Sequence, residues 1–286
     1  MALKQPKEIA KQMRKYLMAV IQMDTRGNKD ANLKAACDFI DEAASKGAKF
    51  VSFPEVFNVI DEGQEAPELV PEGRTISLMA EKARRHHLWI HCGSIAEVNP
   101  EGDRKFNTTA VLNPQGEMVA KYRKLHTFDI TLPDGSVAEE SARIKPGREM
   151  VTVGTEMGCL GLSICYDIRF PELYRYLALH GAQILFAPAN FRMATGKDHW
   201  EALLRARAIE NTCYVVAAGQ YGKKHGTSDS FGNSMIVDPW GTVVARASEG
   251  AGIAVGEIDL EYLDKVRAHL PSLKSRRADV YDTVRK

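Results

Sequence analysis

The sequence of 286 residues lacks the features of several protein classes. Its formal net charge is only +1, from 38 basic and 37 acidic residues, whereas a nucleic-acid-binding protein would show a strong basic excess. Its five cysteines are an odd number without paired spacing, which argues against a disulfide framework. No stretch approaches 18 uncharged apolar residues, so no transmembrane helix is expected. We therefore expect a protein that binds neither nucleic acid nor membrane.

The sequence also lacks signals for export and for common cofactors. Its first long apolar stretch, residues 16–23, has the length of a strand and not that of a signal peptide, so a cytoplasmic location is the default. Residues 195–197 (TGK) do not complete a phosphate-binding loop. The His and Cys residues between 86 and 92 fall on different predicted faces and cannot converge on one ion. We expect no cofactor and no metal.

Short apolar runs alternate with helical patterns along the chain, which contains 44% hydrophobic and 26% charged residues, as folded proteins do. Residues 16–23 and 48–53 read as strands, and residues 29–46 between them have helical spacing. Such a strand–helix–strand unit indicates parallel strands. The order recurs in the second half, with strands over 158–165 and 183–188 and a helix over 170–180.

Two segments 134 residues apart are alike, which indicates two related halves. They are KGAKFVSFPE (46–55) and HGAQILFAPA (180–189). Further helices are expected over 75–87, 196–211 and 259–269, whereas residues 124–150 show no period and read as a long loop. No linker is visible, so we expect one domain over residues 1–286, with two sheets and helices outside.

Cys165 is the first candidate for chemistry. It ends an apolar strand and precedes a predicted helix, whose dipole can push a thiol toward the thiolate. Ligands also bind at the carboxyl ends of strands in open α/β sheets. From position alone, a buried structural cysteine is an equal alternative. Glu55 likewise follows a strand, where a carboxylate either caps a helix or works in a cleft.

A thiol nucleophile needs a base, and the sequence offers two solutions. His126 and His199 are candidate bases. Alternatively, a glutamate takes the thiol proton while a lysine ammonium holds the oxyanion. Lys124 fits the second solution, although a lysine among lysines is usually on a solvated face, as are the loop residues Glu139 and Glu140.

The ensemble of motifs resembles the nitrilase, or carbon–nitrogen hydrolase, superfamily over about residues 16–265. The motifs are FPEVF (53–57), YRKLHTFD (122–129), EESARIKPG (139–147) and ICYDIRFPEL (164–173), followed by similar segments at 195–220 and 237–245. Within the superfamily, CYDIRFPEL is similar to the Nit branch, which includes deaminated-glutathione amidases and ω-amidases.

The resemblance implies a fold and an assembly. The fold is an α/β four-layer α-β-β-α sandwich with two six-stranded-type sheets and helices outside. The assembly is a homodimer or a higher homo-oligomer. Separately, residues 270–286 are polar and lack a core pattern, so we expect a C-terminal tail that either docks on a partner subunit or stays mobile.

The resemblance also implies the catalytic residues of an amidase. Glu55 is the general base and acid, Lys124 stabilises the oxyanion, and Cys165 is the nucleophile that passes through a thioester. Glu140 matches the superfamily's second, supporting carboxylate better than Glu139. The implied reaction converts the carboxamide of a small 2-oxo acid, such as deaminated glutathione or 2-oxoglutaramate, into a carboxylate and ammonia.

Four further residues are candidates for substrate binding. The backbone N–H of Tyr166 would help to hold the oxyanion, and Arg169 would clamp a substrate carboxylate, unless it forms a structural ion pair. Phe128 and Phe191 lie in loops that could line the mouth of the site, with core packing as the alternative. Two other functions remain open: an N-carbamoyl amino acid hydrolase or nitrilase with the same triad, and a non-catalytic binding protein.

Overall fold

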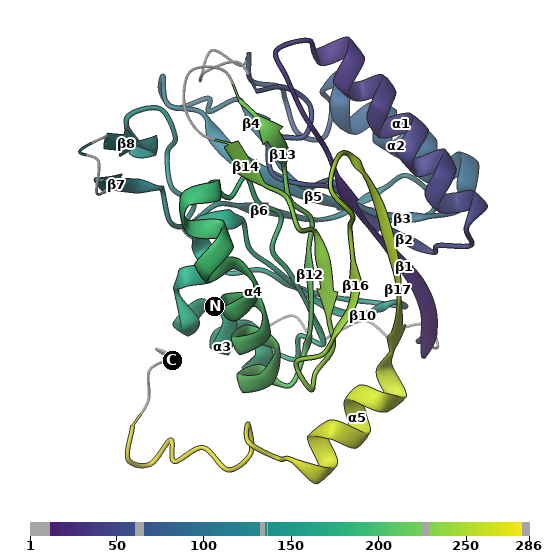
Figure 1. The fold of residues 1–286 in the computed structure, drawn as a ribbon, viewed down its shortest axis with the longest axis vertical. Helices are drawn as coiled ribbons and strands as arrows, with labels where there is room; N and C mark the ends of the chain where they lie inside the picture. Colours follow the sequence, from purple (N-terminus) through teal and green to yellow (C-terminus); the bar gives the residue numbers. More distant parts are fainter. Residues whose placement is uncertain (1–11, 61–65, 132–134, 136, 225–228, 282–286) are drawn as a thin grey trace.

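The computed structural model describes residues 12–60, 66–131, 135, 137–224 and 229–281. Two β-sheets pack face to face and helices cover their outer sides (Figure 1). The first sheet contains, in spatial order, β17 (Gly252–Asp259), β1 (Lys15–Gln22), β2 (Phe50–Ser52), β3 (Trp89–His91), β5 (Phe106–Leu112) and β4 (Ile95–Glu97), with β6 (Met118–Arg123) also paired to β5. The second contains β16 (Val243–Arg246), β15 (Met235–Val237), β12 (Tyr214–Ala217), β11 (Ile184–Phe186), β10 (Gly158–Leu162) and β9 (Thr152–Thr155). The predicted α-β-β-α sandwich is confirmed, with β6 as a seventh strand in one sheet.

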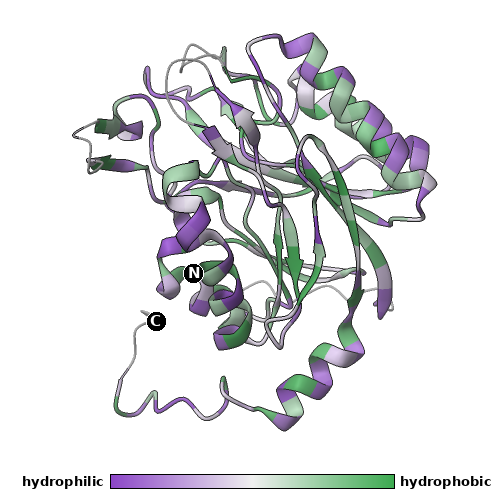
Figure 2. Ribbon diagram, viewed as in Figure 1, coloured by the Kyte–Doolittle hydropathy of each residue, from purple (hydrophilic) through white to green (hydrophobic). Residues whose placement is uncertain are grey.

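Two pairs of helices form the outer layers, and a fifth helix lies near the end of the chain (Figure 1). They are α1 (Lys29–Ser45) and α2 (Arg74–His86) over the first sheet, α3 (Pro171–Leu179) and α4 (Met193–Asn211) over the second, and α5 (Leu260–His269) after β17. The burial pattern of β1 explains the layering. Met18 and Val20 join the core between the sheets, while Ala19 and Ile21 pack with the residues beneath α1 and α2. A strand buried on both faces is apolar without interruption, as the hydropathy colouring of the sheets shows (Figure 2).

The two sheets share a core, and His91 lies within it. The His91 ring stacks on Phe186 of the second sheet, with 4.3 Å between ring centroids. Its two ring nitrogens each lie 3.0 Å from a hydroxyl, those of Ser52 and Thr109. The side chain is fully buried, and this burial lowers its pKa to about 3. His91 is therefore a neutral hydrogen-bonded residue between the two sheets.

The two similar sequence segments form equivalent strands in the two sheets. β2 lies between the parallel strands β1 and β3, and β11 lies in the same way between β10 and β12. Phe50 and Ile184 begin these central strands, 134 residues apart as in the sequence comparison. The parallel units of both halves thus point their carboxyl ends toward a site between the sheets.

One expectation about an individual segment is wrong. Residues 124–150 are not a structureless loop, because they contain a hairpin of β7 (Asp129–Thr131) and β8 (Val137–Glu139) and a 3₁₀ helix, η1 (Glu140–Ala142). These elements have three residues each and little burial, so they carry no hydrophobic period.

The chain after α5 extends away from the sandwich (Figure 1). Residues 270–281 are mostly exposed turns, although Leu273 packs against the core. The rest of the predicted tail, residues 282–286, lies outside the described residues. Within the part of the chain that the structure describes, no helix has the length and apolar character needed to cross a bilayer.

Candidate active site

Glu55, Lys124 and Cys165 lie together at one edge of the sandwich, in a cavity of about 920 Å³. Glu55 follows β2, Lys124 follows β6, and Cys165 follows β10. β6 runs in the direction of β3 because both are antiparallel to β5, so the strands before all three residues end at the same edge. This is the edge at which α/β sheets bind ligands.

Lys124 is buried between two carboxylates, so the solvated-face alternative does not hold. Its Nζ lies 3.0 Å from Glu55 Oε1 and 2.8 Å from Glu140 Oε2, and only 2% of the side chain is exposed. Burial opposes the charged form, but the charges of Glu140 and Glu55 outweigh it and hold the pKa of Lys124 well above its usual value. The buried ammonium is therefore stable because it is paired on two sides.

Cys165 begins a five-residue 3₁₀ helix, η2 (Cys165–Arg169), and holds a protonated thiol at rest. Burial raises its pKa most, and the charge of Glu55 raises it further. The nearby Lys124 charge and a backbone hydrogen bond from Asn190 oppose the shift but do not reverse it. The dipole effect anticipated from sequence does not dominate here. Such a nucleophile needs a base at the moment of reaction.

Glu55 is the group placed to act as that base, because it lines the same cavity as Cys165 and its charge raises the pKa of the thiol. Asn107 Nδ2 donates to its Oε1 at 2.9 Å, and the backbone N–H of Asn190 donates to its Oε2 at 2.8 Å. Gln220 Nε2 donates to the Glu55 backbone carbonyl at 2.9 Å. Glu55 is thus fixed by bonds from three other parts of the chain, two of them to its carboxylate.

Sequence reasoning did not identify Asn107, Asn190 and Gln220. Asn190 and Gln220 follow strands β11 and β12, so the rule that led to Cys165 could have indicated them. Asn107 lies within the sequon Asn107-Thr108-Thr109, a match by chance, since its side chain is buried against Glu55.

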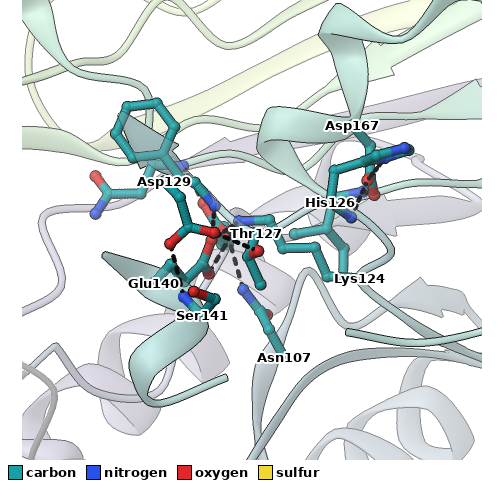
Figure 3. Close-up of polar contacts among 12 residues, drawn as sticks. Asn107, Lys124, His126, Thr127, Asp129, Glu140, Ser141 and Asp167 are labelled. Carbon is teal, nitrogen blue, oxygen red and sulfur yellow. Dashed lines mark hydrogen bonds and ion pairs between the residues drawn. The ribbon is translucent and has the colours of Figure 1, made fainter. Parts of the chain in front are cut away.

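Glu140 reaches Lys124 from the loop segment after the hairpin. Both of its carboxylate oxygens accept from Lys124 Nζ, and Oε2 also accepts from the backbone N–H of Phe128 at 2.6 Å. A bond from the Ser141 backbone N–H to Asp129 closes the same loop (Figure 3). The structure therefore places Glu140 against the lysine, and no contact between Glu139 and Lys124 is present among the described residues.

Four predicted substrate-binding residues line the same cavity: Phe128, Tyr166, Arg169 and Phe191. The Arg169 guanidinium lies 5.0 Å from the centroid of the Phe191 ring, and Arg169 Nη1 lies 3.3 Å from His199 Nδ1. No carboxylate of the described residues forms an ion pair with Arg169. The described residues therefore offer Arg169 no carboxylate with which to form a structural ion pair.

Neither histidine considered as a base is placed to serve Cys165. His126 Nδ1 lies 2.7 Å from Asp167 Oδ1, and His199 is exposed beside Arg169. Neither lines the cavity. Among the residues with described positions, no group of three metal-binding side chains is present, and His86 pairs with Asp41.

Comparisons with known proteins agree with this geometry. The family model described as carbon–nitrogen hydrolase matches residues 17–268. The deaminated glutathione amidase of Synechocystis sp. is 43% identical over 272 residues, which cover 92% of this chain and 99% of that protein. The omega-amidase NIT2 of Homo sapiens is 37% identical, with 94% and 98% coverage. The crystal structure of the C. elegans NitFhit protein has a TM-score of 0.89 and 38% identity, and it covers 96% of this chain and 68% of that chain.

Proposed function

The chain belongs to the carbon–nitrogen hydrolase family, and from this premise we propose that it hydrolyses the carboxamide of a small 2-oxo acid. The observation that carries the proposal is the protonated Cys165 thiol beside Glu55, with the Lys124 ammonium held between Glu55 and Glu140. A nucleophile, its base and an oxyanion-stabilising cation thus meet in one cavity.

The first half of the reaction forms a thioester. Glu55 removes the Sγ proton as the Cys165 sulfur attacks the carboxamide carbon. Lys124 Nζ and the backbone N–H of Tyr166 stabilise the tetrahedral oxyanion. The carbon–nitrogen bond then breaks, and Glu55 gives the proton to the leaving nitrogen, which departs as ammonia from an ω-amide or as an amine from deaminated glutathione.

The second half releases the acid. Glu55 takes a proton from a water molecule, which attacks the thioester carbon. The carbon–sulfur bond then breaks, and Glu55 returns the proton to the Cys165 sulfur. Glu140 does not meet the reacting atoms in this scheme. It orients Lys124 and balances its charge, which a cation in a buried site requires.

The rest of the cavity supports an acidic substrate. Arg169 and Arg192 both line it, and the Arg192 guanidinium lies 5.5 Å from the Phe128 ring centroid. Among the described residues neither has a carboxylate partner, so both are available for a substrate carboxylate. The volume of about 920 Å³ lies in the upper part of the range for small-molecule sites. These features support deaminated glutathione or an ω-amide such as 2-oxoglutaramate.

A substrate panel tests the proposal. Purified protein is incubated with deaminated glutathione, 2-oxoglutaramate, an N-carbamoyl amino acid and a nitrile, and cysteinylglycine, ammonia and carbon dioxide are measured. Cysteinylglycine from deaminated glutathione, or ammonia from 2-oxoglutaramate, without carbon dioxide, supports the proposal. Turnover only of the carbamoyl compound or the nitrile favours the alternative hydrolase with the same triad. No turnover of any compound favours a binding protein.

Arg169 provides a sharper test of substrate class. Arg169→Gln is expected to raise KM about tenfold for 2-oxoglutaramate, which corresponds to about 1.4 kcal/mol. A neutral amide such as propionamide has no carboxylate to lose contact with, so its KM serves as the control. Equal changes for both amides would show that Arg169 does not bind the carboxylate.

The assembly is a further part of the proposal. A homodimer or higher homo-oligomer is supported by the exposed apolar residues Val280 and Tyr281 on the segment beyond α5, which would dock on a partner subunit. Light scattering coupled to size-exclusion chromatography tests this, and a monomer at micromolar concentration would refute it.

A further inference from the structure

We infer that Asp167 is a positioning residue that sets the placement of Lys124 relative to Cys165. Asp167 is fully buried two residues after the nucleophile, and it does not line the cavity. It therefore has no route to the substrate. Its carboxylate instead receives hydrogen bonds from both the segment that carries Cys165 and the segment that carries Lys124.

One side of the carboxylate holds the turn of the nucleophile. Oδ2 accepts a hydrogen bond of 2.8 Å from the backbone N–H of Ile164, directly before Cys165. Cys165 has a φ of 49°, which lies in the left-handed region that residues with a Cβ seldom adopt. Such a conformation persists only where the surrounding structure holds it. The bond from Ile164 is one of the contacts that do so.

The same carboxylate holds the lysine segment from both sides. Tyr122 Oη, two residues before Lys124, donates to Oδ2 at 2.6 Å. Two residues after Lys124, the backbone N–H of His126 donates to Oδ1 at 3.0 Å, and its ring Nδ1 lies 2.7 Å from the same oxygen. Figure 3 shows the His126 ring directed at Asp167. The lysine is thus held between two anchors on one group.

Packing contacts hold the same two partners of Asp167 in place. The His126 ring stacks on Phe170, with 3.6 Å between centroids and 8° between planes. Tyr122 is almost fully buried, and burial raises its pKa first of all, so its hydroxyl stays a donor. Both neighbours of Asp167 are therefore rigid, and the carboxylate transmits a fixed geometry between the two segments.

A carboxylate suits this arrangement better than the matching amide. The backbone N–H groups of Ile164 and His126 and the Tyr122 hydroxyl donate to its two oxygens, His126 Nδ1 is a fourth contact, and a carboxylate accepts at both oxygens. An asparagine has one accepting oxygen, and its NH₂ group would face donors in place of the second. Asp167→Asn therefore keeps the shape of the side chain while it removes two of the four bonds.

The test measures turnover of the panel's best amide and alkylation of Cys165 by iodoacetamide. We expect Asp167→Asn to lower kcat about 100-fold, the cost of a displacement of about 1 Å in a catalytic group, with KM within about threefold of wild type. The pH profile of alkylation should move to higher pH, because the nearby Lys124 charge lowers the thiol pKa. Unchanged kcat together with an unshifted profile would overturn the inference.

A matched control separates positioning from stability. Glu68 is a second buried carboxylate, which does not itself line the cavity; it accepts from Thr75 and Asn58 and pairs with Lys29. Glu68→Gln should lower Tm while kcat and the alkylation profile stay as in wild type. If Asp167→Asn gives no soluble protein, Tyr122→Phe decides, with an expected fall in kcat of about tenfold. A kcat within twofold of wild type in that variant would overturn the inference.

The inference rests on the proposed Glu55–Lys124–Cys165 centre, but it can fail separately. If wild type hydrolyses neither 2-oxo acid amide of the panel, the proposed function fails. The alkylation profile of Cys165 still reports whether Asp167 controls the distance of Lys124 from the thiol.

Discussion

The two halves of the chain build the same parallel three-stranded unit and end its strands with different chemistry. In the first half, β2 is followed by Pro54 and Glu55. At the matching point of the second half, Pro188 and Ala189 follow β11. Strand β1 of the first half corresponds to β10 of the second, with Val20 matching Leu162. Three residues after these positions, the first half has the buried Met23 and the second has Cys165.

This difference shows how one scaffold divides the chemistry. The strands determine where a side chain reaches the cavity, and the residue type at that point determines what it does. The proposed base, Glu55, comes from the first half and the proposed nucleophile, Cys165, from the second, so the packing of one sheet on the other fixes their separation. The backbone N–H of Asn190 in the second half completes the link by binding Glu55 of the first.

Removal of the thiol in the second half should have the largest effect. Cys165→Ala leaves no nucleophile, and we expect turnover to fall more than about 10⁴-fold, as when the nucleophile of a catalytic unit is removed. The measurement is ammonia release from the preferred amide.

The first half contains a matched control for this change. Cys92 follows β3, is fully buried, and does not line the cavity. Cys92→Ala should retain turnover within about threefold of wild type. Full ammonia release by Cys165→Ala would refute the assignment of chemistry to the second half's thiol.

Removal of the base in the first half should have the next largest effect. Glu55→Gln is expected to lower kcat about 10³-fold, within the range for a general acid–base group, because every proton in the scheme passes through this carboxylate. The Glu55 charge raises the pKa of Cys165, so its loss should move thiol alkylation to lower pH.

In Glu55→Gln, turnover therefore falls while the thiol becomes easier to alkylate at a given pH. The alkylation profile moves to lower pH, whereas Asp167→Asn is expected to move it to higher pH. Turnover within tenfold of wild type would mean that another group takes the thiol proton.

The smallest expected effect concerns His91, which lies at the contact between the two halves and should make the free energy of unfolding depend on pH. Its folded-state pKa is about 3, below the unfolded value of about 6.5, so the unfolded chain binds more protons between these pH values. Stability is therefore complete above about pH 6.5 and falls as pH decreases, by up to about 1.4 kcal/mol per pH unit.

Urea unfolding at pH 7 and pH 5 measures this dependence, and the expected loss from His91 is about 2 kcal/mol. His91→Gln removes the titrating group, so the difference between the two pH values should shrink. The same pH dependence in both proteins would show that other groups cause it.

How far the site is predictable from sequence depends on where each residue obtains its environment. Glu55 and Cys165 directly follow buried strands, so local pattern alone made them candidates. Lys124 lies in the basic segment KYRK, where pattern indicates a solvated face, and only the resemblance to a known family identified it. Its burial arises from carboxylates 69 and 16 residues away, which no local pattern records.

The fold shows the same division between local and long-range information. The long strands and helices have clear hydrophobic periods, and the structure contains them near the expected boundaries. The hairpin of β7 and β8 has three-residue strands with little burial, so its sequence carries no such period. The role inferred for Asp167 depends on donors 41 and 45 residues away, although the residue itself lies in the motif that identified Cys165.

The protonated state of Cys165 has a consequence for oxidative damage. Peroxides attack thiolates, and the path to irreversible sulfinic and sulfonic acids begins with that form. A nucleophile that is buried and neutral between turnovers presents little of it. As the proposed nucleophile, Cys165 is therefore expected to resist oxidation between turnovers without a disulfide partner.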